Sequence, residues 1–60
     1  MLYNATYIGS NQDMLEYGKQ YIIRVDEGLS SVLVYKYIRK QRYLIGIASK
    51  SEFDNFKPAN

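Results

Sequence analysis

The residues that could do acid–base or nucleophilic chemistry in this 60-residue chain are few. With no Cys and no His, the chain has no disulfide framework, no Cys/His zinc site, no thiol nucleophile and no imidazole base. Asp26 and Glu27 are adjacent, and adjacent side chains on a strand point to opposite faces, so they cannot form a catalytic pair. Glu52 and Asp54 are better explained by capping a short helical turn. We therefore expect no catalytic residue, no metal and no cofactor, and a protein that is not an enzyme.

The four glycines also lack the spacing of a phosphate-binding loop, because they are spread one per turn or strand. Gly46 lies inside an apolar run, which predicts a bulge or bend. A small-molecule pocket of roughly 300 Å³ would hollow out a core of this size. The glycines therefore indicate turns and bends rather than a ligand site.

The densest charge cluster lies in the second half of the chain. Four of the eight basic residues fall within seven positions, no acidic residue occurs between Gly28 and Ser51, and three tyrosines flank the cluster. Cations that neutralise phosphates, beside rings on which bases stack, are typical of single-stranded nucleic-acid surfaces. A net charge of +2 and a pI near 9.0 are low for such a binder, and a solvated hairpin tip that prevents edge-to-edge aggregation explains the charges equally well. The candidate binding surface comprises Tyr35, Lys36, Tyr37, Arg39, Lys40, Arg42 and Tyr43.

A protein partner is the second interpretation of the same residues. Seven tyrosines in sixty residues cannot all be interior, because each buried hydroxyl needs a hydrogen-bond partner. Exposed Tyr beside Arg is typical of interface hot spots. The aromatic groove that binds Pro-rich peptides is not expected, since residues 9–17 carry only Asp13 and Glu16 as acids and the chain has no Trp. We favour a protein partner, keep nucleic acid as the alternative, and leave a homodimer open.

The elements that must position these residues are strands. Period-two alternation and β-branched or aromatic residues predict four strands, at Leu2–Ile8, Lys19–Val25, Ser31–Arg39 and Arg42–Ala48. Residues 26–28 predict a turn, and residues 39–42 a hairpin tip without the usual Gly or Asn. Strands three and four are apolar on both faces for part of their length, as are central strands of a bent sheet or strands covered by a partner.

The C-terminal residues predict a short turn and a last strand. Residues 49–52 match a capping box. Phe53 and Phe56 are three apart, on one side of a helical or 3₁₀ turn, and both rings are expected in the core. Phe56-Lys57 could continue as a very short fifth strand. Residues 14–17 are compatible with a helical turn, but four residues are too few to predict one.

Five short strands, a long loop after the first and a helical turn before the last follow the order of an SH3-like small barrel. Three stretches extend the likeness: Tyr7-Ile8-Gly9, Gly18-Lys19-Gln20-Tyr21-Ile22-Ile23 and Ser51-Glu52-Phe53-Asp54-Asn55-Phe56. Together they resemble small SH3-like barrel proteins encoded by phages and prophages of Gram-positive bacteria, most of them uncharacterised. The tip at residues 39–42 is more basic than that family's pattern. The resemblance implies a fold and a genetic setting, and no activity or functional residue.

The whole of residues 1–60 is expected to form one all-β domain, because the chain is too short for a second core. No basic stretch precedes an apolar run at the N-terminus, so we expect no signal peptide. The longest apolar run is far short of the ~20 residues that span a bilayer. The expectation is a cytoplasmic, non-catalytic interaction module, an accessory protein of phage type that binds a host or phage protein.

Overall fold

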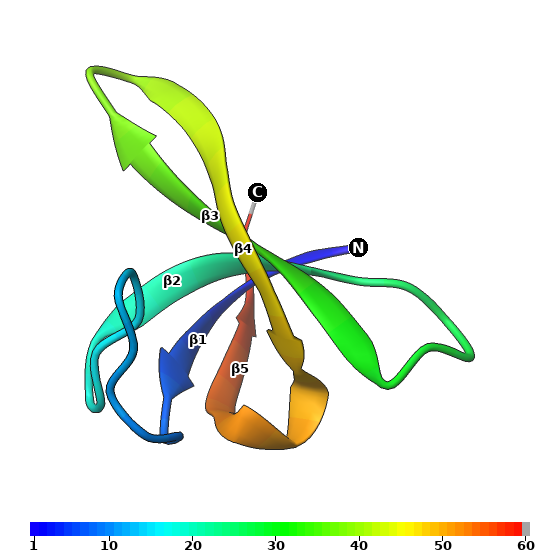
Figure 1. The fold of residues 1–60 in the computed structure, drawn as a ribbon. Coiled ribbons are helices and arrows are strands. Elements are labelled where there is room, and N and C mark those ends of the chain that lie inside the picture. The colour runs from blue at the N-terminus through cyan, green and yellow to red at the C-terminus, as the bar shows by residue number, and fades with distance from the viewer. Residues whose placement is uncertain (60) are drawn as a thin grey trace.

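The computed structural model describes residues 1–59, and within them five antiparallel strands form one sheet (Figure 1). In chain order the elements are β1 (Leu2–Tyr7), β2 (Gln20–Val25), β3 (Ser31–Ile38), β4 (Gln41–Ser49), the 3₁₀ turn η1 (Lys50–Glu52) and β5 (Phe53–Pro58). The strand order is β4-β3-β2-β1-β5. The all-β prediction is confirmed, and the first four strands lie within about one residue of their predicted bounds. The sheet is not closed, because its edge strands β4 and β5 do not pair with each other.

One face of the curved sheet holds the core, as period-two alternation predicts. Tyr7 is fully buried at its centre, and its ring meets the rings of Tyr21 and Phe53 edge-on, with centroids 6.5 and 5.4 Å away. The Tyr7 hydroxyl donates to the Ser10 carbonyl at 2.7 Å and accepts from the Gln12 amide at 2.8 Å, so its burial leaves no polar atom unpaired. The buried residues are Ala5, Tyr7, Leu15, Tyr21, Ile23, Val32, Val34, Ala48 and Phe53.

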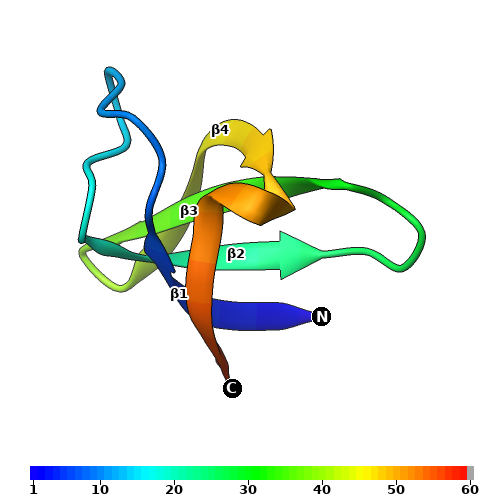
Figure 2. The ribbon, with the colours of Figure 1, turned by 90° about the horizontal axis from the view of Figure 1, so that it is seen from below.

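The long connection between β1 and β2 covers one end of this core. Figure 2 shows it rising from the strands as an extended loop. Residues 14–17 form no helical turn, and the loop is instead held by Leu15, which is buried, and by the Glu16 N–H, which donates to the Tyr21 hydroxyl at 2.9 Å. A single apolar side chain thus anchors a polar loop to the sheet.

At the C-terminal turn the predicted capping contact is confirmed, whereas the predicted position of Phe53 and Phe56 on the turn is wrong. The Ser49 N–H donates to the Glu52 carboxylate at 3.0 Å, which is the contact expected from Glu in a capping box. The 3₁₀ turn ends at Glu52, so Phe53 and Phe56 lie on strand β5 rather than on a turn. Asn55 has a φ of +55° at an irregularity in the β1–β5 register, and the helical spacing of the two rings therefore does not apply.

Only one of the two rings enters the core. Phe53 is buried, whereas Phe56 remains 36% exposed. The Phe56 ring packs edge-on against Tyr3 with centroids 5.8 Å apart, at the margin of the core. The prediction that both rings are core residues is correct for Phe53 and wrong for Phe56.

Candidate interaction surface

The predicted surface lies on the β3–β4 hairpin, which extends beyond the rest of the sheet (Figure 1). β3 pairs with β2 only between Val32 and Tyr35, whereas its pairing with β4 continues to the pair Ile38–Gln41. Residues 36–43 are therefore a two-stranded arm without a third strand beside it. We call these residues the arm.

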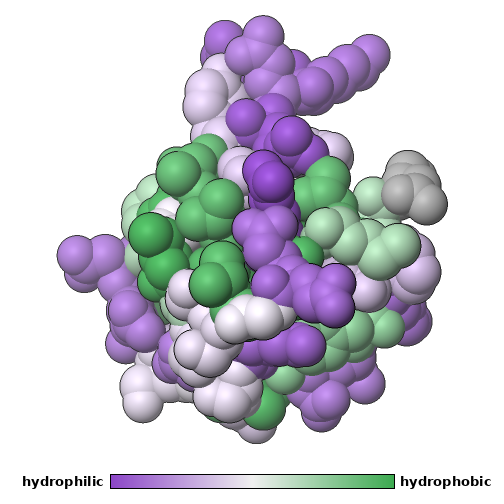
Figure 3. Space-filling model, turned by 90° about the vertical axis from the view of Figure 1, so that its right-hand side faces the viewer, coloured by the Kyte–Doolittle hydropathy of each residue, from purple (hydrophilic) through white to green (hydrophobic). Residues whose placement is uncertain are grey.

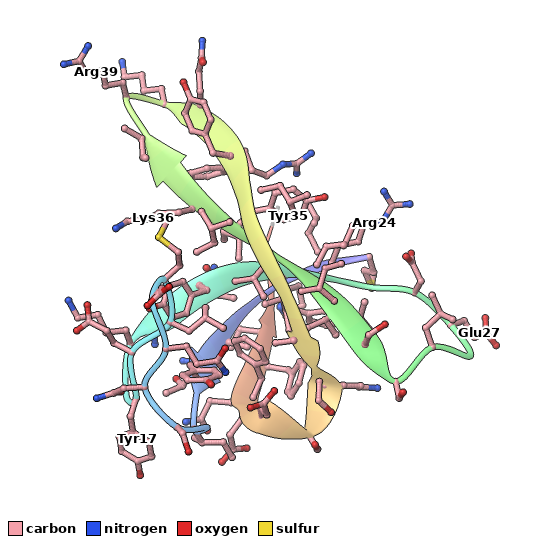
Figure 4. The ribbon with its side chains drawn as sticks, in the orientation of Figure 1. Tyr17, Arg24, Glu27, Tyr35, Lys36 and Arg39 are labelled. Atoms are coloured by element: carbon pink, nitrogen blue, oxygen red, sulfur yellow. The ribbon has the colours of Figure 1, made fainter. Side chains whose placement is uncertain are left out.

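The tip of the arm is a two-residue turn formed by Arg39 and Lys40, between the paired residues Ile38 and Gln41. Both tip residues have positive φ, 52° and 67°, as type I′ hairpin turns require, and such turns normally use Asn-Gly. A left-handed conformation costs a residue with a long side chain about 1–2 kcal/mol. Figure 4 shows Arg39 pointing away from the body of the molecule. The tip thus exposes two cations to water, and their left-handed backbone lowers the stability of the hairpin.

The predicted residues of the two strands do not share one face. Cross-strand pairing sets Tyr37 opposite Arg42 and Lys36 opposite Tyr43, and adjacent residues on a strand face opposite ways. Tyr35, Tyr37 and Arg42 therefore lie on the face of the hairpin that points away from the core, which we call the outer face. Figure 4 shows Tyr35 and Lys36 on opposite sides of the hairpin. The Arg42 guanidinium carbon is 4.8 Å from the centroid of the Tyr35 ring, a cation–π distance.

A bulge in β4 adds two residues to the outer face that the sequence did not indicate as site residues. The register pairs Tyr35 with Leu44 but Val34 with Gly46, so Ile45 is an extra residue and the bulge expected around Gly46 is confirmed. Without it, Leu44 and Ile47 would face opposite ways; with it, both lie on the outer face. The sequence signal was the run of residues 43–47, which is apolar at both parities.

These side chains are exposed. Tyr37 is 59% exposed, Leu44 57% and Ile47 68%. Figure 3 shows hydrophobic side chains on both sides of a band of hydrophilic ones. A large apolar residue is common singly on a surface, but a contiguous group of them marks an interaction site more often.

The hairpin that carries this apolar patch has only positive charges, although acids of other segments border it. β3, the tip and β4, residues 31–49, carry four cations and no Asp or Glu. On the neighbouring strand, Arg24 pairs with Leu33 across the sheet, and its guanidinium is 3.2 Å from the Asp26 carboxylate. Asp26 is therefore partnered, and the acids that border the patch itself are Asp13 of the β1–β2 loop and Glu52 of η1, both beside Ile47.

Two hollows border the hairpin on the side of the β1–β2 loop. One, of about 490 Å³, is lined by Tyr35, Lys36 and Tyr37 together with loop and β2 residues that include Met14 and Glu16. The other, of about 360 Å³, lies between residues 12–15 of the loop and residues 45–47 of β4. The loop thus comes close to the middle of β4 without hydrogen bonding to it in the described part of the chain.

The structure offers little for other kinds of site. Among residues 1–59, no group of three or more acidic side chains is placed to hold a metal ion, and no helix in that range has the length and hydrophobicity to cross a bilayer. Comparisons of the chain with protein-family models, with curated proteins and with solved structures found no match.

Proposed function

We propose that this chain is a non-catalytic interaction module that binds another protein through the outer face of its β3–β4 hairpin. The observation that carries the proposal is the exposure of Tyr37, Leu44 and Ile47 on one face, beside Arg42. Burying a side chain of the size of Leu or Ile contributes about 1.5–3 kcal/mol. Tyr and Arg are also the residue types enriched in interface hot spots.

We further propose an SH3-like fold and an accessory role of phage type in the cytoplasm of a host cell. Support for the fold comes from the strand order and from the 3₁₀ turn directly before the last strand. Support for the setting comes from the resemblance of residues 7–9, 18–23 and 51–56 to small phage proteins. A protein that acts by covering a site on its partner needs a complementary surface and no catalytic group.

Nucleic-acid binding is the second candidate, and the arm is the observation in its favour. A two-stranded ribbon fits the major groove of DNA, and four cations project on this ribbon without an acid among them. For base stacking the arm is less suited, because Arg42 already covers the Tyr35 ring and Tyr43 lies on the opposite face from Tyr37. Four phosphate contacts would weaken binding by about two decades between 50 and 200 mM salt. Titration of labelled single- and double-stranded oligonucleotides at those two concentrations measures this directly.

Site-specific crosslinking tests the proposed protein partner. Ile47→p-benzoylphenylalanine places a photoreactive group on the outer face, and Leu29→p-benzoylphenylalanine places one in the β2–β3 turn, where the side chain is 56% exposed. In cells that carry the gene, we expect a discrete protein crosslinked at position 47 and absent at position 29. Equal crosslinking at both positions, or crosslinks to nucleic acid alone, would overturn the proposal.

A further inference from the structure

We infer that the free edge of β4 binds an extended segment of the partner as an additional strand, with the acidic residues of that segment beside the arm. The inference rests on the proposed function, because it specifies how a protein partner docks on the same hairpin. An unpaired edge strand exposes a row of backbone donors and acceptors, and extended segments bind to such edges by continuing the sheet.

The two edges of the sheet differ in a way that favours β4. At the β5 edge, Asn55 is left-handed within a bulge and Pro58 lacks an N–H, and bulges, prolines and lysines such as Lys57 are the usual means of blocking an edge. β4 is nine residues long, contains no Pro, and has one bulge at its centre. Within residues 1–59, the backbone of residues 41–48 makes hydrogen bonds only to β3.

The hairpin register shows which backbone groups are free. The pair that closes a two-residue hairpin exchanges both of its hydrogen bonds, and bonded and non-bonded pairs then alternate along the strands. Because Ile38–Gln41 closes this hairpin, the N–H groups of Arg42 and Leu44 point away from β3. An added strand would meet these two donors first.

The positive charge of the arm indicates which kind of segment the β4 edge would bind. The half of the edge that belongs to the arm carries Arg42 and lies next to Lys40 and Arg39 at the tip, and carboxylates facing these cations make charge-assisted hydrogen bonds. A second copy whose arm paired with this arm would set the same cations against one another, and like charges across strands are destabilising. The edge therefore fits an acidic segment better than it fits another copy of this chain.

The other half of the edge is apolar and hollowed. The 360 Å³ hollow beside residues 45–47 is lined by Met14, Leu15, Ile45 and Ile47, with Asp13 and Gln12 at the same site. Asp13 disfavours an acid there, whereas an aliphatic side chain of the added strand would fill the hollow. The expected ligand is thus acidic over the arm and apolar over the middle of β4.

The probe is an eight-residue peptide that alternates Glu with Val in one half and Val with Thr in the other, synthesised with the Glu half at either end. Binding is followed by amide resonances and hydrogen exchange of the protein. We expect slowed exchange at the Arg42 and Leu44 amides, at least about tenfold weaker binding when Lys replaces Glu, and a similar loss when the peptide backbone is N-methylated at alternate residues. The N-methylated peptide keeps the charge and the side chains, and replaces the hydrogen-bond donors by methyl groups.

Two variants separate backbone from side chain on the protein. Leu44→Pro removes the free N–H, and Leu44→Ala keeps it while shortening the side chain. Strand addition predicts a loss of at least about tenfold for Leu44→Pro and a smaller one for Leu44→Ala. Equal losses, or peptide binding without edge protection, would overturn strand addition. If Leu44→Pro fails to fold, the binding of the N-methylated peptide alone tests strand addition.

The outcome is distinguishable from a failure of the proposed function. A partner crosslinked at position 47 together with neither peptide protecting the edge would leave the protein-binding role intact and reject strand addition. Concentration-dependent dimerisation that protects Arg42 and Leu44 would identify a second copy as the occupant and reject an acidic segment. Oligonucleotide binding with no protein crosslinked at position 47 and no peptide binding would reject both.

Discussion

The left-handed backbone at Arg39 and Lys40 destabilises the tip of the hairpin. Replacing these two residues by ones that favour this conformation tests the hairpin geometry directly. The variant Arg39→Asn/Lys40→Gly keeps the two-residue turn and supplies residues that accept the observed φ values of 52° and 67°. Each left-handed residue costs about 1–2 kcal/mol. Gly removes this cost at position 40 and Asn removes part of it at position 39, while the greater entropy of Gly in the unfolded chain costs about 0.5–1 kcal/mol. We expect a net stabilisation of about 1–2 kcal/mol.

Thermal unfolding followed by circular dichroism measures this gain. In a domain of this size, about 1 kcal/mol corresponds to roughly 4–8 °C in Tm. The matched control is Arg39→Gln/Lys40→Gln, which removes the same charges and leaves the backbone strained, so its free energy of unfolding should change by less than about 0.5 kcal/mol per residue. An Asn-Gly variant no more stable than the Gln control would refute the type I′ geometry at the tip. Since the natural tip keeps both cations, we expect the stabilised variant to bind the acidic peptide more weakly than the unmodified protein.

Three further comparisons, with five substitutions in all, test the packing. Phe53→Ala should cost about 3–5 kcal/mol in urea unfolding and Phe56→Ala clearly less, because Phe56 is partly exposed; similar costs would contradict the asymmetry of the two rings. Gly9→Ala should destabilise by about 1–3 kcal/mol, since a Cβ there would stand 2.6 Å from the Tyr7 hydroxyl, and an unchanged Tm would show that this contact is not tight. The third comparison tests the cation–π contact. Arg42→Gln removes the cation over the Tyr35 ring and should lower the free energy of unfolding by about 0.5–1 kcal/mol. Lys36→Gln removes a cation on the other face and should not change it measurably.

The sequence predicts the strands well because their signal is local. Alternation along residues 3–7 and 21–25 is set by one buried face, and the structure buries that face. The interruption between two apolar runs predicted a tip at residues 39–42, and the structure confirms a tip there but limits it to residues 39 and 40. By contrast, the spacing of Phe53 and Phe56 suggested one helical face, whereas both residues lie on β5, and Phe56, which follows the bulge at Asn55, packs against Tyr3 at the margin of the core. A single left-handed residue is not visible in such a pattern.

The candidate site was predicted in composition and not in arrangement. Sequence proximity grouped seven residues around the arm, but cross-strand pairing divides them between two faces and the tip. Leu44 and Ile47 were missed because three residues apart on a regular strand means opposite faces, and only the bulge at Ile45 aligns them. Gly46 predicted a bulge, but not which residue would be left without a partner. Pairing with β3 determines that this residue is Ile45, and such pairing is a tertiary property.

The measurement that tests the central claim most directly compares two matched leucines. Leu44 on the outer face and Leu29 in the β2–β3 turn are the same residue type with nearly equal exposure, so Leu44→Ser and Leu29→Ser perturb the free protein similarly. Calorimetric titration against the partner crosslinked at position 47 should show at least about tenfold weaker binding for Leu44→Ser, as for a hot-spot residue, and unchanged binding for Leu29→Ser. Equal affinities for the two variants would contradict the claim that the outer face of the hairpin is the binding surface.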